Sequence, residues 1–327
     1  MELILCNTNL AVTTVVCQIK LQPEKEFLIL TDQTNIFLFF KTLALPNITL
    51  IHINSSFGLK DIISLIRTKL KIKKIINKFG IEGCYMYHQA FGDLYNWAIH
   101  YCHKIGLPIT YFRQLSEIKH PKASFSLETI KLYFKYNVLY SCNIEVIDRG
   151  NNHLIPKLSK SFIKDNDIQE KQYQINKDVI KNIANILITK LNINISSNKV
   201  ILLTGSVMAT NQVTKEEYAL KIKELIEHIG KDNVICKCHP RFNDETELEK
   251  MLPHIPGFIP MEFLLEYFNV FIGYNSTILI EAANNKKKAI SLINYFKPTN
   301  YQRRDRWFSY FGKSKIIYPQ QIKDIEL

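Results

Sequence analysis

Short apolar runs alternate with longer amphipathic segments along most of the chain. A few apolar residues bounded by Asn, Asp, Gly or Pro are typical of a buried strand, whereas apolar residues at every third or fourth position predict a helix. In the first half these patterns predict strands at 3–6, 27–31, 48–53, 84–87 and 109–112, and helices at 9–19, 35–43, 59–77 and 94–105. Strands and helices that alternate in this way predict a parallel, Rossmann-like sheet.

The pattern changes in the middle of the chain and then resumes. Between 119 and 162 it is less regular, with a helix expected at 127–134 and a strand at 144–147, and the charged segment 164–174 predicts an inter-domain linker. An amphipathic helix at 179–191 precedes a second alternating series. That series predicts strands at 200–203, 234–238, 257–260, 270–274 and 289–293, and helices at 215–229, 245–252, 261–267 and 277–283.

Two Rossmann-like halves in series predict an α/β protein of the GT-B type, with two Rossmann-like domains and a cleft between them. We expect an N-terminal acceptor domain at 1–163, a linker at 164–178 and a C-terminal domain at 179–327. In this architecture the C-terminal domain binds the donor nucleotide, and the reaction occurs in the cleft.

Composition narrows the class of partner. The chain has 327 residues, of which 46% are hydrophobic, so it is long enough to form two domains. Its 42 basic and 30 acidic residues give a net charge of +12, which suits a nucleotide, a phosphoglycan, nucleic acid or an anionic lipid surface. The sequence shows neither a basic leader segment nor an apolar stretch long enough to span a membrane. We therefore expect a cytoplasmic protein that can touch the inner membrane peripherally.

The seven cysteines are odd in number and lie in apolar stretches, which favours buried thiols in a reducing compartment. The run Cys236-Lys237-Cys238-His239 has some likeness to a metal site, but no second pair with zinc-like spacing follows it. Alternation along a strand also places the two cysteines on one face and His239 on the other. We expect no metal site.

His239 is the strongest candidate for chemistry. It follows the predicted strand 234–238, and Pro240 turns the chain out of the sheet, so the imidazole is expected to face the cleft. Histidine titrates near neutral pH and can protonate a departing phosphate or neutralise its charge. Arg241, the next residue of the H-P-R motif, is assigned to the nucleotide. The alternative is a half-buried histidine that caps a loop.

Hydroxyl side chains follow another predicted strand at the start of a helix. Asn275, Ser276 and Thr277 come directly after the strand 270–274. Hydroxyls and unpaired backbone N–H groups at a helix start favour a phosphate. An ordinary helix N-cap by Asn275 or Ser276 explains the same residue types.

Two further features complete the candidate nucleotide site. Glu262, in the first turn of a predicted helix, suits the hydroxyls of a ribose, and Glu281 could take the same role. A carboxylate in a first turn also stabilises its own helix, so neither assignment is required. Gly205 and Ser206 end the first strand of the second half, where glycine lets the backbone approach a ligand closely.

Taken in order, these motifs resemble bacterial sialyltransferases, most closely glycosyltransferase family 52, which includes lipooligosaccharide α-2,3-sialyltransferases. The likeness rests on L-I-L-C-N-T-N-L at the start, on the strand before Ser206, on C-K-C-H-P-R, and on the I-P-M-E-F-L-L and N-S-T segments. It implies a CMP-activated sialic acid, or a related nonulosonic acid, as donor and a cell-surface glycan, free or lipid-linked, as acceptor. It also implies an inverting, metal-independent reaction without a cofactor.

The resemblance implies that His239 stabilises the leaving phosphate, that Glu262 holds the ribose and that Ser276 and Thr277 hold the phosphate. One departure concerns the general base, because the family places an Asp in G-S-P-D where this chain reads G-S-V-M. Asp93, Asp148 and Glu117 are the open alternatives. The missing base leaves open an altered donor, an altered acceptor or an inactive homologue.

Two other functions fit the same sequence. One is a transferase with another nucleotide donor, such as a CDP-alditol, in the synthesis of a capsule or teichoic-like polymer. The other is a non-catalytic basic module that binds an anionic glycan or nucleic acid. A strand-end histidine argues against mere binding, and a nucleic-acid surface would need more basic residues along one face.

Overall fold

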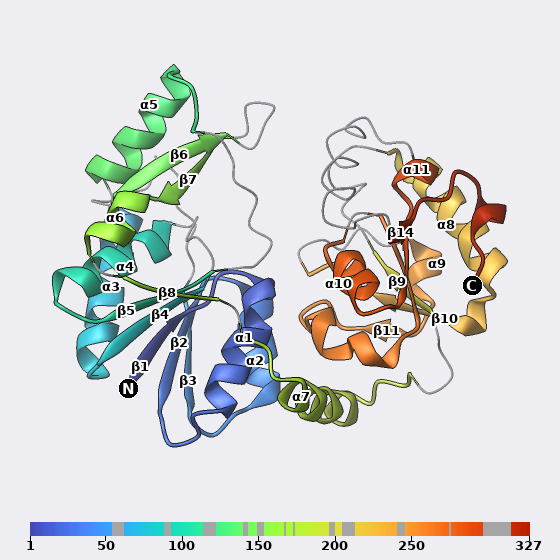
Figure 1. Cartoon of the computed structure of the whole chain (residues 1–327), viewed down its shortest axis with the longest axis horizontal. Helices are drawn as coiled ribbons and strands as arrows, with labels where there is room; N and C mark the ends of the chain where they lie inside the picture. The colour runs from blue at the N-terminus through green and yellow to red at the C-terminus, as the bar shows by residue number, and fades with distance from the viewer. Residues whose placement is uncertain are drawn as a thin grey trace. The chain divides into compact units, whose positions relative to one another are not determined.

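The computed structural model describes residues 1–53, 62–87, 93–113, 122–139, 143–148, 154–166, 168–172, 174–195, 200–204, 213–240, 246–274, 276–296 and 315–327. The chain divides into two compact units, Met1–Val179 and Ile180–Leu327 (Figure 1). The boundary falls inside helix α7 (Lys177–Lys190). Each unit is built around a parallel sheet of its own.

The first unit contains a six-stranded parallel sheet in the order β3-β2-β1-β4-β5-β8. Helices α3 and α4 cover one face, and α1 and α2 lie on the other (Figure 1). The strands are β1 (Glu2–Leu5), β2 (Phe27–Thr31), β3 (Ile48–His52), β4 (Gly83–Tyr87), β5 (Ile109–Arg113) and β8 (Gln169–Gln172), and the helices are α1 (Asn9–Lys20), α2 (Thr34–Leu43), α3 (Ile62–Lys78) and α4 (Asp93–Lys104).

The second unit repeats this strand order as β11-β10-β9-β12-β13-β14, again with every pair parallel. Helices α8 and α11 pack on one face of the sheet. The strands are β9 (Val200–Leu203), β10 (Val234–Lys237), β11 (His254–Ile255), β12 (Val270–Gly273), β13 (Lys288–Ser291) and β14 (Ile316–Ile317), and the helices are α8 (Lys215–Ile229), η2 (Lys231–Asn233), α9 (Glu247–Lys250), η3 (Met261–Tyr267), α10 (Ile278–Asn284), α11 (Ile293–Phe296) and η4 (Ile322–Asp324).

The two sheets confirm the predicted fold class, an α/β protein of GT-B type with two Rossmann-like domains. If the strands of each sheet are numbered by their order along the chain, both sheets begin with the spatial order 3-2-1-4-5. This is the strand order of a dinucleotide-binding fold. Central strands are buried on both faces: all five residues of β2 are inaccessible to solvent. Apolar side chains on both faces of a strand are expected where helices cover a parallel sheet from both sides.

An antiparallel hairpin adds a small layer to the first unit. It consists of β6 (Ile144–Asp148) and β7 (Leu154–Leu158) and packs against α5 (Leu127–Tyr133), which continues into the π-helical segment η1 (Phe134–Leu139). Helix α6 (Lys160–Asp165) follows the hairpin and precedes β8.

Three local predictions differ from the structure. The strand predicted at 257–260 is wrong, since these residues form a turn and the third strand is His254–Ile255. The helix predicted at 261–267 is a 3₁₀ helix. Part of the segment predicted as a linker forms β8, which pairs with β5. Among the helices that the structure describes, none is long and apolar enough to cross a membrane.

Candidate functional site

The candidate site lies at the carboxyl edge of the second sheet. Its strand order reverses between β9 and β12, and ligands of open α/β sheets bind beyond the carboxyl ends of the strands at such a reversal. The chain leaves β9 at Thr204, leaves β10 at Cys238 and His239, and reaches Ser276 soon after β12. The fold therefore brings the predicted His239 and Ser276–Thr277 segments to the same edge.

Thr204 fixes the backbone of His239. Its N–H and its hydroxyl donate hydrogen bonds to the carbonyl of Lys237, at 3.1 and 3.2 Å. The same hydroxyl accepts a hydrogen bond of 2.8 Å from the N–H of His239. Thr204 is buried, whereas His239 is partly exposed. The ends of β9 and β10 are thus joined by one side chain, and His239 is held where they meet.

Lys237 joins β10 to the turn that follows β11. The lysine is only 6% exposed, and its Nζ donates hydrogen bonds to the carbonyls of Cys238 (2.8 Å) and Gly257 (3.0 Å). Gly257 packs so tightly here that a Cβ on it would lie 3.1 Å from the carbonyl oxygen of His239. Sequence patterns alone pointed neither to Lys237 nor to this role of Gly257. A lysine inside the apolar run V-I-C-K-C was the available signal.

Glu262 lies in the first turn of η3, which follows the turn held by Lys237. The pKa of Glu262 is raised to about 7, chiefly because the carboxyl is buried. A hydrogen bond from its own backbone N–H lowers the pKa, the negative charge of Glu281 raises it, and the positive charge of Lys237 lowers it. Burial also raises the pKa of Glu281, in the first turn of α10. The Glu262 carboxyl therefore interacts electrostatically with a second carboxyl group, that of Glu281, and with the buried ammonium group of Lys237. The choice between Glu262 and Glu281 for a ribose stays open.

Ser276 and Thr277 lie between β12 and α10, as the sequence predicts. Thr277 already has helical dihedral angles (φ −58°, ψ −25°) and makes no side-chain capping hydrogen bond. The N-cap alternative concerned Asn275 or Ser276, and it stays open. Both residues are partly exposed. Gly273, at the end of β12, lies so close to β9 that a Cβ on it would be 2.9 Å from Cβ of Leu203. Glycine therefore permits the two strands to approach at the reversal.

Several predicted residues fall outside the described part of the chain. They are Gly205, Ser206, Arg241, Asn275 and the alternative base Glu117. Asp93 begins α4, but its side chain is not described. Asp148 ends β6, opposite Leu154 in the antiparallel hairpin, and so does not lie at the carboxyl edge of either six-stranded sheet.

Asp32 is a carboxylate at the carboxyl edge of the first sheet that the sequence analysis missed. It directly follows β2, and its N–H donates a 2.8 Å hydrogen bond to the Tyr95 hydroxyl. That hydroxyl donates to the Asp32 carboxylate, which also accepts from Gln33 Nε2 at 2.8 Å. Burial and the charge of Asp32 raise the pKa of Tyr95 well above its usual range, so Tyr95 stays protonated as a donor. A single Asp after an apolar strand gave only a weak sequence signal.

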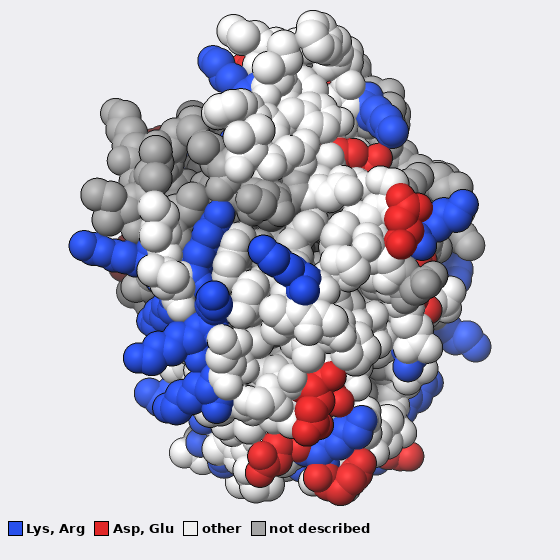
Figure 2. Space-filling view, turned by 90° about the vertical axis from the view of Figure 1, so that its left-hand side faces the viewer, with Lys and Arg blue, Asp and Glu red and all other residues white. Residues whose placement is uncertain are grey.

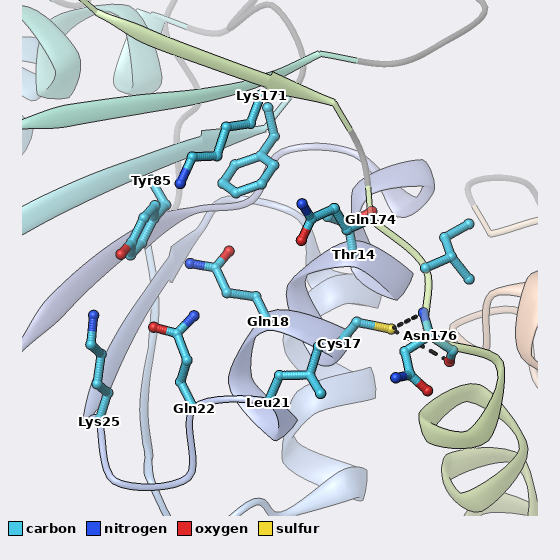
Figure 3. A pocket seen from close by; sticks show the side chains of 12 residues that line it. Thr14, Cys17, Gln18, Leu21, Gln22, Lys25, Tyr85, Lys171, Gln174 and Asn176 are labelled. Carbon is cyan, nitrogen blue, oxygen red and sulfur yellow. Dashed lines mark hydrogen bonds between the residues drawn. The ribbon is translucent and has the colours of Figure 1, made fainter.

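The first unit also contains a pocket of about 540 Å³ over the face of its sheet (Figure 3). Tyr85 and Lys171 extend from the strands, Gln18 extends from α1, and Gln22 extends from the segment just after α1, toward this space. Lys25, which precedes β2, closes its lower side in this view. The pocket therefore lies between α1 and the face of the sheet formed by β4, β5 and β8. Asp32 is not among its lining residues.

The cysteines and histidines form no evident metal site in the described segments, where no three His, Cys, Asp or Glu side chains gather closely enough to hold an ion. Cys6, Cys17, Cys84, Cys102 and Cys236 are buried thiols, and Cys238 is partly buried. Cys142 lies outside the described residues.

Comparison with known proteins gives a fold but no family. No protein-family model matches the chain, and no curated protein matches it. The UDP-GlcNAc 2-epimerase of Methanocaldococcus jannaschii has a similar structure, with a TM-score of 0.53 and 13% identity over 99% of this chain and 90% of that one. The structure of the same enzyme in complex with UDP-GlcNAc and UDP has a TM-score of 0.51 and 14% identity, over 99% of this chain and 90% of that one. The UDP-GlcNAc 2-epimerase of Neisseria meningitidis bound to UDP-GlcNAc has a TM-score of 0.44 and 12% identity, over 96% of this chain and 94% of that one.

These findings overturn the resemblance to family 52 sialyltransferases, which is wrong. The similar structures are those of UDP-GlcNAc 2-epimerases, and no family model supports a CMP-sialic acid enzyme. The motifs misled for a physical reason. A strand-end histidine, hydroxyls at a helix start and a nearby carboxylate suit any phosphate and ribose, so they do not distinguish one nucleotide base from another.

Proposed function

We propose that this protein is a GT-B enzyme that uses a UDP-sugar and transfers the sugar to a hydroxyl group of a glycan. The observation that carries the proposal is that His239 and the Ser276–Thr277 segment follow β10 and β12 at one edge of the second sheet, next to the reversal of its strand order, while Glu262 interacts electrostatically with Lys237 of β10. The choice of uridine is supported by the two similar structures with the higher TM-scores, one of which is a complex with UDP-GlcNAc and UDP.

In this proposal the second unit holds the nucleotide. The hydroxyls of Ser276 and Thr277 donate hydrogen bonds to the diphosphate, and the carboxylate of Glu262 or Glu281 accepts them from the ribose hydroxyls. Gly205, Ser206, Arg241 and Asn275 complete the proposed nucleotide site. Lys237 and Thr204 do not touch the ligand, because their polar groups hold the backbone around His239.

The reaction is a displacement at the anomeric carbon of the sugar. The acceptor oxygen forms a bond to that carbon, the bond from the carbon to the phosphate oxygen breaks, and its electron pair leaves with UDP. His239 donates a proton or a hydrogen bond to the departing phosphate. A base takes the proton of the acceptor hydroxyl, and Asp32 joins Asp93 and Glu117 as a candidate. Asp148 is not proposed, because it ends a strand of the antiparallel hairpin. The proposal needs no metal ion or cofactor.

A second function has a specific observation in its favour, because both structures with the higher TM-scores are epimerases. An epimerase would convert UDP-GlcNAc without any acceptor, whereas a transferase releases UDP in proportion to glycan product. NMR of the sugar nucleotide, together with measurement of released UDP with and without a glycan acceptor, separates the two.

The test of the proposal is turnover with a panel of UDP-sugars and bacterial glycan acceptors. We expect acceptor-dependent UDP release, which His239→Ala lowers at least about a hundredfold in kcat because a proton donor is lost. His228→Ala is the matched control, since His228 bonds the carbonyl of Ile325 on a distant part of the same unit. Conversion of UDP-GlcNAc without an acceptor would show that the protein is an epimerase and not a transferase. Equal losses of kcat in the His239→Ala and His228→Ala variants would show that His239 takes no part in the reaction.

A further inference from the structure

One helical segment of the first unit exposes an unusual number of large apolar side chains. Phe125 is 90% exposed, Leu127 68%, Ile130 42%, Phe134 56% and Val138 59%. They lie just before and along α5 and η1, and the last four recur at spacings of three or four residues, so they share one side of the helical segment. We call these five residues the α5 surface.

The opposite side of the same segment already packs against the protein. Thr129 and Tyr136 are buried, and Tyr136 and Leu132 join Ile144 and Val146 of β6 in a small apolar cluster. A helix that is apolar on its buried side needs polar residues on the other side to remain in water. This one is apolar on both sides. Its exposed side therefore has the character of a contact surface.

Lysines outnumber acids in the segment that carries the α5 surface. Lys122, Lys131 and Lys135 lie in the segment 122–139, against the single acid Glu128. Lys122 also pairs with Glu145 at 3.8 Å, and Lys135 lies over the ring of Tyr136, 5.0 Å from its centroid. Seen from the left of Figure 1, the upper part of the described surface is largely uncharged, with blue side chains and some red ones at its margins (Figure 2). The chain as a whole carries a net charge of +12.

We propose that the α5 surface docks on an anionic lipid bilayer, with its apolar side chains among the acyl chains and its lysines at the headgroups. Apolar and aromatic side chains next to lysines are the composition of a helix that lies in a membrane interface. Each lysine near an anionic membrane surface adds to the attraction. A second copy of the chain fits less well, because a two-fold contact would bring like lysines together. The docking does not depend on which sugar nucleotide the second unit uses.

The test is flotation of the full chain with vesicles of phosphatidylcholine, with and without phosphatidylglycerol. We expect binding to the phosphatidylglycerol vesicles that weakens with added salt. Phe125→Ser with Leu127→Ser lowers the bound fraction by about tenfold or more, since each side chain contributes through its buried apolar area. Both positions are highly exposed, so the fold is retained.

The matched control is Leu220→Ser with Met251→Ser, which removes two apolar side chains that are 59% and 67% exposed on the second unit. It leaves vesicle binding unchanged. Lys131→Glu weakens binding only to the anionic vesicles. Absence of binding by the unmodified protein, or an equal loss in the control, overturns the proposal. A concentration-dependent dimer that Phe125→Ser with Leu127→Ser disperses, without vesicle binding, overturns it in favour of self-association.

Discussion

At the scale of single residues, the protonation of Glu262 links the site to pH. Its pKa lies near 7 because burial disfavours the charged form, and the charge of Glu281 adds to the effect while Lys237 offsets part of it. In the unfolded chain the same carboxyl titrates near the usual value of 4.5. The folded protein therefore binds more protons than the unfolded chain between these two values, and its stability falls as the pH rises from about 4.5 to about 7.

Glu262→Gln removes this dependence. We expect the variant to be more stable than the unmodified protein by about 1–3 kcal/mol at pH 8, and equally stable near pH 4, where the carboxyl is protonated in both states. Urea unfolding at both pH values measures the difference. Glu227→Gln, at a residue whose side chain is 65% exposed, is the control and changes neither value. A Glu262→Gln variant that is less stable at pH 8 would contradict the burial of an ionising carboxyl.

Thr204 offers a test of how His239 is held. Thr204→Val keeps the shape of the side chain but removes the acceptor for the His239 N–H, so we expect a loss of about 1–3 kcal/mol in unfolding free energy and a lower turnover. Thr204→Ser retains the oxygen and stays close to the unmodified protein in both measurements. Equal behaviour of the two variants would show that the hydrogen bond does not fix the histidine.

At the scale of elements, the sequence predicts the central strands of both sheets and misses the hairpin strand β7 and the edge strands β8 and β14. Strand β8 has four exposed residues, Gln169–Gln172, and joins the sheet only through its backbone pairing with β5. No periodicity can signal such an edge strand. Strand β11 is formed by His254–Ile255 and not by residues 257–260 as predicted. Gly257 instead lies in a turn that packs against the backbone of His239.

The close approach of β9 and β12 gives a prediction at this scale. Gly273→Ala places a Cβ 2.9 Å from Cβ of Leu203, in the middle of the sheet where neither strand can shift, and costs about 1–3 kcal/mol of stability. Gly83→Ala is the matched strand glycine, because its Cβ meets only the movable carboxylate end of Glu2. Thermal unfolding compares them. A larger loss for Gly83→Ala would contradict this account of the strand reversal.

At the scale of the whole molecule, local pattern was sufficient for the fold and insufficient for the ligand. Alternating strands and helices predict both sheets, and the position of His239 follows from a strand that ends in His-Pro. The hydrogen bonds from Thr204 to the Lys237 and His239 backbones, and the contact of Gly257 with His239, join residues distant in sequence, so no motif contains them. The motifs that suggested a CMP donor describe phosphate and ribose, which all nucleotides share.

The central claim is that the second unit binds a uridine nucleotide at the edge formed by β9, β10 and β12. Calorimetric titration with UDP and with CMP tests it most directly, using the unmodified protein, Ser276→Ala with Thr277→Val, and the Leu220→Ser control. We predict that UDP binds more tightly than CMP, and that losing both hydroxyls weakens UDP binding by about tenfold or more while the control does not. CMP binding as tight as UDP binding, or UDP binding unaffected by the double substitution, would contradict the account.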